Sequence, residues 1–119
     1  MDLQDRCPVC EAVNALIKDS HDTAVDKGWW MGDEHNFCEK LCLAHGEISE
    51  VMEAFRDHNA FDTIITVDGK PEGIAVELAD VLIRIFDLCG RYHIPLAEAL
   101  KLKAQFNKSR PFRHGGKLA

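Results

Sequence analysis

Two pairs of acidic residues with helical spacing stand out in this sequence. Glu47 and Glu50 are three positions apart, and so are Glu77 and Asp80. Because side chains three positions apart lie on the same face of a helix, each pair would present two carboxylates in one direction. Four converging carboxylates repel one another unless a cation offsets their charge, and Mg²⁺ and Mn²⁺ prefer oxygen ligands. The spacing therefore predicts a divalent metal site.

Two helices, expected near residues 34–58 and 72–92, must position these pairs. The second of them is apolar around most of its circumference, which is typical of a central, buried helix. Its narrow polar strip comprises Glu77, Asp80, Arg84 and Asp87. Carboxylates on such a strip must be paired or bound to a metal. Since Arg84 could pair with Glu77 and Asp80, a structural salt-bridge network stays open as the alternative.

The remaining periodicity predicts an all-α chain with four main helices. A first helix is expected near residues 9–23, and a fourth begins at Pro95 and ends near residue 108. Residues 63–67 form either a short strand or an extended segment before the Asp68-Gly69 turn. A length of 119 residues predicts one domain over the whole chain, built from α-helical hairpins.

Composition excludes several classes of protein. Hydrophobic residues make up 46% and charged residues 29%, which is typical of a soluble globular domain. No apolar run reaches the roughly 18 residues of a membrane span, and the acidic start of the chain does not resemble a secretory signal. We therefore expect a cytoplasmic protein without a membrane partner. A net charge of −6 argues against nucleic acid as a partner.

The charge is distributed unevenly along the chain. Six of the 14 Lys and Arg residues lie after residue 100, and none of the 20 Asp and Glu residues does. We expect residues of about 107–119 to form a basic tail that ends flexibly at 114–116. An acidic body with a basic tail suits a site for metal and phosphate. The alternative is a solvated tail that pairs with the body.

The cysteines leave a second kind of site open. The five cysteines are Cys7, Cys10, Cys38, Cys42 and Cys89. The odd number argues against a disulfide framework. Cys7 and Cys10 have the spacing of a zinc knuckle or a redox motif, and Cys38 and Cys42 could complete a four-thiolate site. Because the second pair lies within a helical pattern and no βαβ unit is predicted, we favour structural cysteines and do not expect zinc at Cys7 and Cys10.

Three segments in order resemble the motifs of a known family. They are KLCLAHGEISE at 40–50, ELADVLIR at 77–84 and NKSRPFRHGG at 107–116. Together they resemble the MazG-like family of all-α nucleoside triphosphate pyrophosphohydrolases, whose signature is ExxE followed by ExxD. The resemblance runs from about residue 28 to the end. It implies a four-helix unit that assembles as a dimer or a dimer of dimers.

The resemblance also implies a reaction and its residues. Glu47, Glu50, Glu77 and Asp80 would hold Mg²⁺, for which Mn²⁺ could substitute. Water would attack the α-phosphorus of a nucleoside or deoxynucleoside triphosphate and give the monophosphate and pyrophosphate. Glu47 and Glu50 would be the catalytic pair, with Glu50 as the proton acceptor. Alternatives are a dCTP or dUTP pyrophosphatase, or a non-catalytic helical interaction module with a zinc-binding Cys-x-x-Cys motif.

Substrate contacts are expected from three parts of the chain. The candidates are Trp29, Trp30, Lys40, Arg84, Asn107, Lys108, Arg110, Arg113 and His114. The cations would hold phosphates, with the tail reaching across a subunit boundary, and the tryptophans would stack on the base or pack in the core. Two adjacent tryptophans suit a large ring, so we favour a purine such as guanine. A homodimer or homotetramer is expected, because a single four-helix unit leaves its apolar third helix exposed.

Overall fold

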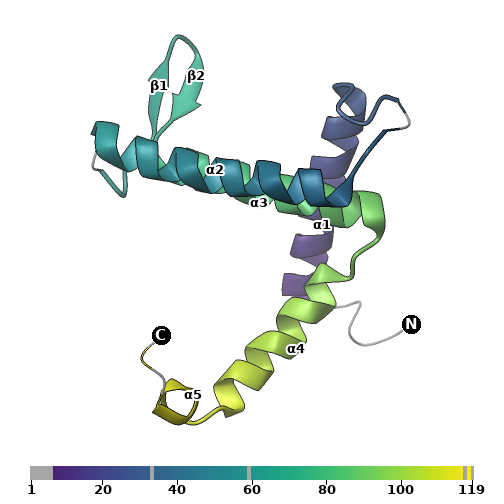
Figure 1. The fold of residues 1–119 in the computed structure, drawn as a ribbon, viewed down its shortest axis with the longest axis vertical. Coiled ribbons are helices and arrows are strands. Elements are labelled where there is room, and N and C mark those ends of the chain that lie inside the picture. The colour runs from purple at the N-terminus through teal and green to yellow at the C-terminus, as the bar shows by residue number, and fades with distance from the viewer. Residues whose placement is uncertain (1–6, 33, 59, 117, 119) are drawn as a thin grey trace.

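The computed structural model describes residues 7–32, 34–58, 60–116 and 118, and its fold is almost entirely helical (Figure 1). The elements in chain order are α1 (Pro8–Asp26), α2 (Phe37–His58), β1 (Ile65–Val67), β2 (Lys70–Glu72), α3 (Ile74–Tyr92), α4 (Leu96–Ser109) and α5 (Arg113–Gly116). The prediction of an all-α chain with four main helices is confirmed. The backbone of residues 113–116, where we expected a flexible end, forms the short helix α5.

The start of α2 differs from the prediction. We expected residue 34, whereas the helix begins at Phe37. The Asn36 side-chain oxygen accepts a hydrogen bond of 3.1 Å from the backbone N–H of Glu39. Asparagine is among the residues preferred for capping a helix in this way, because the first N–H groups have no partner within the helix. The cap leaves the preceding residues outside the helix.

The end of α1 lies one turn beyond the prediction. The backbone N–H of Trp29 bonds the carbonyl of Ala24 at 3.0 Å, and Gly28 has a φ of 86°. A left-handed glycine with this backward hydrogen bond is a common helix ending, because glycine adopts positive φ without a steric penalty. The turn leads directly into Trp29 and Trp30 and so sets the direction of both side chains.

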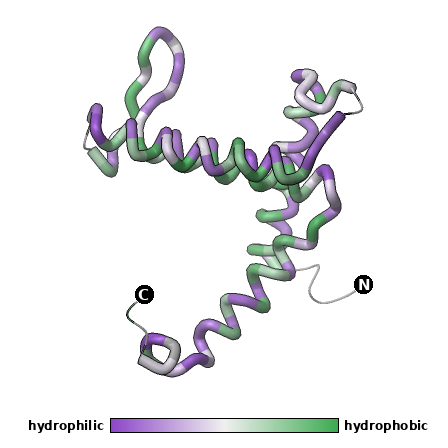
Figure 2. The backbone as a smooth tube through the Cα atoms, viewed as in Figure 1, coloured by the Kyte–Doolittle hydropathy of each residue, from purple (hydrophilic) through white to green (hydrophobic). Residues whose placement is uncertain are grey.

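Helix α3 is the centre of the molecule, as predicted, and both α1 and α2 pack against it. The approach of α1 is close at Gly90, where an added Cβ would lie 2.5 Å from Cβ of His21. The buried apolar side chains are Cys10, Trp30, Ala44, Ala54, Ile74, Val81, Leu88, Cys89 and Ala97. Figure 2 shows hydrophobic residues along most of α3, with polar residues more frequent on the other helices.

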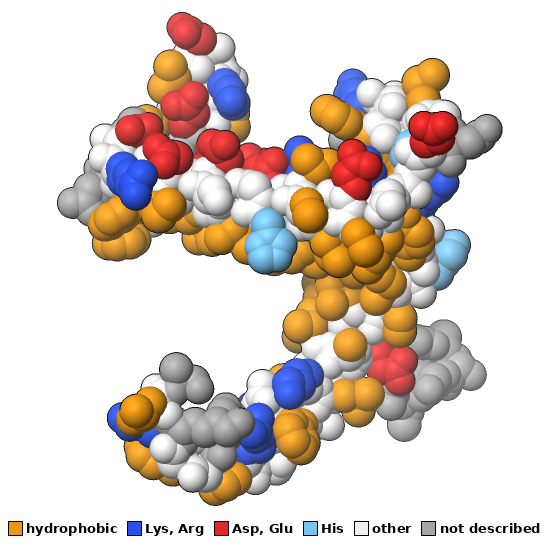
Figure 3. All heavy atoms as spheres, in the orientation of Figure 1, with side chains coloured by type: hydrophobic (Ala, Val, Ile, Leu, Met, Phe, Trp, Pro, Cys, Tyr) orange, Lys and Arg blue, Asp and Glu red, His pale blue; other side chains and the backbone are white. Residues whose placement is uncertain are grey.

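The apolar circumference of α3 predicted that a single chain would leave part of this helix exposed, and the structure agrees. Leu78, Leu82 and Ile83 remain 49%, 51% and 49% exposed. Figure 3 shows hydrophobic side chains gathered along the side of α2 that faces the C-terminal helices. The helices therefore form an open arrangement in which α3 is covered on only part of its circumference.

A β-hairpin joins α2 to α3. Strands β1 and β2 pair antiparallel with Thr66 opposite Pro71, and the turn residues Asp68 and Gly69 have φ of 52° and 80°. Two successive positive φ values are typical of the tight turns that match the twist of a hairpin. The predicted extended segment before the Asp-Gly turn is thus a strand. Gly73 places the base of the hairpin against α3, since an added Cβ would lie 2.8 Å from the Thr63 carbonyl oxygen.

Helix α4 packs against α1 and then extends away from α2 and α3, carrying α5 at its far end (Figure 1). The radius of gyration is 17.1 Å, compared with about 13.5 Å for a compact domain of this length. The chain therefore has an extended C-terminal arm. None of the helices in the described part of the chain combines the length and hydropathy needed to cross a membrane.

Candidate metal centre and adjoining cavity

Packing of α2 on α3 brings three of the four predicted acidic residues together. Glu47, Glu77 and Asp80 each offer a carboxylate oxygen within 4.8 Å of the other two, and all three residues are half-buried. Within the described ranges, no other set of three His, Cys, Asp or Glu residues converges in this way. Glu50 lies outside the group and is exposed. We call Glu47, Glu77 and Asp80 the acidic cluster.

The electrostatics of the acidic cluster disfavour a negative charge on Glu77. The pKa of Glu77 is raised, first because the side chain loses solvent and then because the charges of Asp80, Glu50 and Glu47 disfavour its ionised form. Glu50 therefore influences the cluster although its carboxylate is not one of the three converging groups. Raised carboxyl pKa values of this origin are typical of sites that hold a cation or a proton.

Among the described residues, a single cationic side chain forms a hydrogen bond with the acidic cluster. Arg84 on α3 donates a hydrogen bond of 3.0 Å from its Nε to a Glu47 carboxylate oxygen. The predicted pairing of Arg84 with Glu77 and Asp80 is therefore wrong in its partners, because the guanidinium reaches across to α2. One positive charge facing three carboxylates leaves a net negative site of oxygen donors, which fits Mg²⁺ or Mn²⁺.

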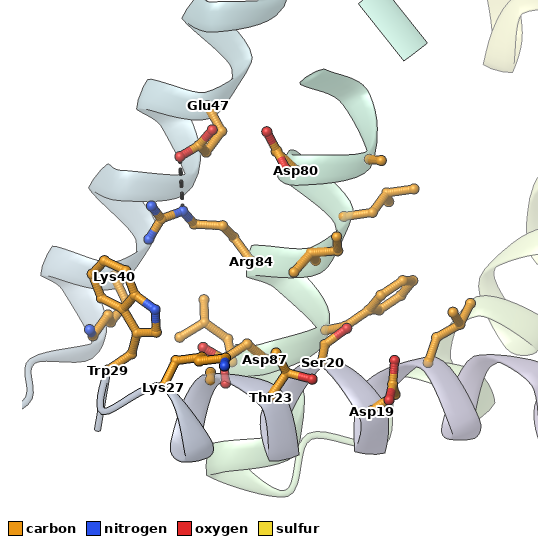
Figure 4. Close-up of a pocket in the computed structure, with 17 residues that line it drawn as sticks. Asp19, Ser20, Thr23, Lys27, Trp29, Lys40, Glu47, Asp80, Arg84 and Asp87 are labelled. Carbon is orange, nitrogen blue, oxygen red and sulfur yellow. Dashed lines mark hydrogen bonds and ion pairs between the residues drawn. The ribbon is translucent and has the colours of Figure 1, made fainter. Parts of the chain in front are cut away.

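A cavity of about 700 Å³ adjoins the cluster and shares Glu47 and Asp80 with it (Figure 4). Its walls come from α1, α2 and α3 and from the segment that follows α1. The cations Lys27, Lys40 and Arg84 contribute to these walls. In Figure 4, Glu47 and Asp80 lie across from each other, with Arg84 between them and the Trp29 end of the cavity. The cavity therefore joins negative and positive groups in one space.

Comparisons of the chain with protein-family models, curated proteins and solved structures gave no match. The resemblance to the MazG-like family therefore rests on the three sequence segments at 40–50, 77–84 and 107–116. The chemistry of the site has to be argued from the geometry of its own residues.

The two tryptophans, which the sequence treats alike, have different surroundings. Trp29 is 63% exposed and lines the cavity, whereas Trp30 is 7% exposed. Lys40 and Arg91 lie over the Trp30 ring, with their charged groups 4.6 Å and 4.9 Å from its centroid. Of the two predicted stacking residues, Trp29 has an accessible indole and Trp30 packs in the core. Lys40 contacts Trp30 and also borders the cavity.

A polar network that sequence reasoning missed fixes Trp30. Its Nε1 donates a hydrogen bond of 2.9 Å to the Asp87 carboxylate, which also accepts one of 2.8 Å from Nδ1 of His21. His35 donates from Nε2 to the carbonyl oxygens of Trp30 and Gly32, at 3.0 Å and 2.9 Å. The one feature of the sequence that could have indicated this network is the position of Asp87 on the polar strip of α3. The network anchors the segment that presents Trp29.

The described part of the basic tail does not reach the acidic cluster within one chain. Asn107 and Lys108 end α4 as exposed residues. The guanidinium carbons of Arg110 and Arg113 lie 5.4 Å from the rings of Phe106 and Phe112, respectively. Helix α4 carries all of these residues away from α2 and α3 (Figure 1). The side chain of His114, the remaining predicted tail contact, lies outside the described residues.

The described residues of one chain do not form the alternative four-thiolate site. Cys7 and Cys10 lie at the start of α1, and Cys38 and Cys42 are exposed on α2. No group of three or more ligand residues in the described ranges includes a cysteine. A zinc ion held by all four thiolates of one chain would therefore require a different arrangement of the helices.

Proposed function

We propose that this protein is a metal-dependent nucleotide hydrolase that cleaves a nucleoside or deoxynucleoside triphosphate to the monophosphate and pyrophosphate. The observation that carries the proposal is the junction of the acidic cluster with a cavity lined by cations and an exposed indole. A triphosphate nucleotide has the matching parts, namely an anionic chain that needs cations and an aromatic base that stacks. The motif resemblance to MazG-like pyrophosphohydrolases points to the same reaction.

In this proposal the acidic cluster holds the cation. Glu47, Glu77 and Asp80 would bind Mg²⁺ or Mn²⁺, and Glu50 would add a fourth oxygen donor. The ion would offset charge on the phosphate oxygens and lower the pKa of a water molecule. Glu50 is the most exposed of the four carboxylates, so it is the one best able to accept a proton from the attacking water.

The cavity would hold the substrate beside that cluster. Lys40 and Arg84 would bind phosphate oxygens, and Arg84 would exchange its bond with Glu47 for one with the substrate. Trp29 would stack on the base, a contact worth about 1–3 kcal/mol. The large ring area of an indole favours a purine, guanine included, over a pyrimidine. A dCTP or dUTP pyrophosphatase remains the alternative within the same class.

We also propose that two copies of the chain assemble. The accessible surface is 9184 Å², whereas a compact monomer of 13.4 kDa exposes about 6,500 Å². The excess is roughly 2,700 Å² per chain and so about 5,400 Å² for two chains, which lies at the upper end of what obligate homodimers bury. On α2, Leu41, Ile48, Met52 and Phe55 are between 41% and 55% exposed and recur at helical spacing. This stripe would pack against a second copy, which would bring a basic tail from one chain toward the other.

Assembly is tested by sedimentation of the whole protein and of Met52→Glu. A charge on the α2 stripe should convert dimers or larger assemblies into monomers. Ser49→Glu adds the same charge on the same helix outside the stripe and should leave the mass unchanged. A monomeric mass for the unaltered protein at micromolar concentration would refute the assembly.

The reaction is tested with a panel of NTPs and dNTPs in Mg²⁺ and Mn²⁺, assayed for monophosphate and pyrophosphate. In ¹⁸O-labelled water the label should appear in the monophosphate. Glu47→Gln should abolish turnover, and Glu53→Gln, an equal charge change on the same helix, should not. Nucleoside diphosphate with labelled inorganic phosphate would contradict attack at the α-phosphorus.

One observation favours a non-catalytic module instead. The Arg84–Glu47 hydrogen bond gives the acidic cluster a protein partner, as a purely structural network would. No hydrolysis of any nucleotide, together with no stabilisation by Mg²⁺ or Mn²⁺, would leave that function as the conclusion. Hydrolysis that Glu47→Gln abolishes would exclude it.

A further inference from the structure

The Cys7-Pro8-Val9-Cys10 segment has no role in the proposed nucleotide site. Cys7 is the N-cap residue of α1, with extended backbone angles, and Pro8 is the first residue of the helix. Cys7 is partly exposed, whereas Cys10 is 8% exposed and faces the core. An accessible thiol and a sheltered one thus lie next to each other at the positive end of a 19-residue helix.

The surroundings of Cys7 favour its thiolate form. The pKa of Cys7 is lowered, first by the backbone N–H of Cys10 and then by the Cys10 side chain, the backbone N–H of Val9 and the ammonium of Lys101, although the loss of solvent opposes them. Cys7 is the N-cap and Cys10 the third residue of α1, and these two positions lie close together in the first turn of a helix.

We propose that Cys7 and Cys10 form a redox-active dithiol, with Cys7 as the attacking thiolate and Cys10 as the resolving thiol. The accessible sulfur would react first with a small-molecule disulfide, and the sheltered neighbour would complete the exchange. Redox-sensing cysteines share this combination of a stabilised, accessible thiolate and an adjacent resolving cysteine. The site is separate from the acidic cluster and does not depend on the proposed hydrolase activity.

The exchange has two balanced steps. The Cys7 thiolate attacks one sulfur of the oxidant, so that a mixed disulfide forms and one small thiolate leaves. Cys10 then loses its proton and attacks the Cys7 sulfur, which forms the Cys7–Cys10 bond and releases the second small thiolate. The protein loses two electrons and two protons in total, and the oxidant becomes two thiols.

The other cysteines provide internal controls. Cys38 and Cys42 are exposed on α2, and Cys89 is buried on α3, where the loss of solvent raises its pKa. If exposure alone set reactivity, Cys38 and Cys42 would react before Cys7. If the polar groups around Cys7 at the start of α1 set reactivity, the less exposed Cys7 would react first. The order of alkylation therefore separates the two explanations.

The first experiment treats the reduced, full-length protein with limiting iodoacetamide at neutral pH and maps the labelled residues by mass spectrometry. We expect Cys7 to react several-fold faster than Cys38 and Cys42. Cys10→Ala removes the neighbouring thiol and should slow Cys7 several-fold, whereas Cys42→Ala should not. Labelling of Cys38 or Cys42 before Cys7 would overturn the proposal.

The second experiment equilibrates the protein with reduced and oxidised glutathione, then blocks the remaining thiols and digests with trypsin. Cys7 and Cys10 share the peptide 7–18, while Cys38 and Cys42 fall in different peptides on either side of Lys40. We expect peptide 7–18 to lose two hydrogen atoms and to resist alkylation. A glutathione adduct that persists on Cys7, or protection of both thiols by zinc that a chelator reverses, would overturn the dithiol assignment.

Discussion

Replacing Asp80 with asparagine should change the stability of the protein in opposite directions with and without Mg²⁺. In the chelated protein the Asp80 carboxylate lies within 4.8 Å of those of Glu47 and Glu77. Two unit charges at that separation repel by about 0.9 kcal/mol in bulk water and by about 3.5 kcal/mol at an effective dielectric constant of 20. Because Arg84 already offsets Glu47 and the cluster is half-buried, removing one charge should stabilise the chelated protein by about 1–2 kcal/mol.

With Mg²⁺ present the sign should reverse. A bound ion whose free concentration is one hundred times its Kd stabilises the folded protein by about 2.7 kcal/mol. A variant that no longer binds the ion gains none of this stabilisation. Asp80→Asn should then be about 1 kcal/mol less stable than the unaltered protein, the difference between the lost binding and the relieved repulsion. A purely structural salt-bridge network predicts no such reversal.

The assay is thermal unfolding at pH 8, at one protein concentration, in EDTA and in saturating MgCl₂. For a chain of this length, 1 kcal/mol corresponds to roughly 4 °C in Tm. Glu53→Gln makes the same charge change on α2 and should respond equally in both buffers. If Asp80→Asn lowers the Tm in EDTA, or if Mg²⁺ stabilises it as much as the unaltered protein, the acidic cluster is not a metal site.

Three further predictions concern Glu77, the two tryptophans and the basic tail. The folded protein holds the Glu77 proton more tightly than the unfolded chain does, because the pKa of Glu77 is raised. The chelated protein should therefore lose stability as the pH rises from the usual glutamate pKa through the raised one. Urea titrations at stepped pH measure this loss, and Glu77→Gln should remove it. Trp30→Ala should lower the free energy of unfolding by about 3–5 kcal/mol, whereas Trp29→Ala should change it by less than about 0.5 kcal/mol and raise the nucleotide KM about 5- to 100-fold. Equal effects of both substitutions on KM would contradict the assigned roles. Deleting residues 110–119 should raise the KM for a triphosphate by about a hundredfold or more, because two charge-assisted phosphate contacts would be lost, and it should not weaken Mg²⁺ binding. An unchanged KM would show that the tail is solvated and does not bind phosphate.

The acidic cluster could be predicted from the sequence because helical spacing fixes the direction of side chains. Glu77 and Asp80 lie on the only polar strip of an otherwise apolar helix, so their inward position follows from the pattern. Positions three apart on a helix still differ by about 60° around its axis, so a packing seam can include one member of a pair and leave out the other. That geometry explains why Glu47 joins the cluster while Glu50 stays exposed.

The roles of the two tryptophans could not be predicted in the same way. Trp29 and Trp30 are adjacent and equally hydrophobic, and no local pattern separates them. The difference arises because Asp87, 57 positions away, accepts a hydrogen bond from the Trp30 indole. Only the crossing of α1 over α3 brings these residues together, and that crossing depends on the absence of a side chain at Gly90. Long-range packing of this kind leaves no periodic signal in the sequence.

The incomplete burial of α3 follows from the position of the cavity. As the sequence predicted for a single chain, part of this apolar helix is uncovered: Leu82 and Ile83 are about half exposed, and both line the cavity that Trp29 also lines. A nucleobase has apolar faces, so a bound nucleotide would cover the side chains that no helix of the same chain covers. In the proposed function, the apolar sector of α3 thus contributes to binding the base while its polar strip holds the metal. Leu82→Ser should then weaken the binding of nucleotides far more than that of pyrophosphate, because pyrophosphate has no base. Equal loss for both ligands in calorimetric titrations would show that Leu82 supports the fold and not the base.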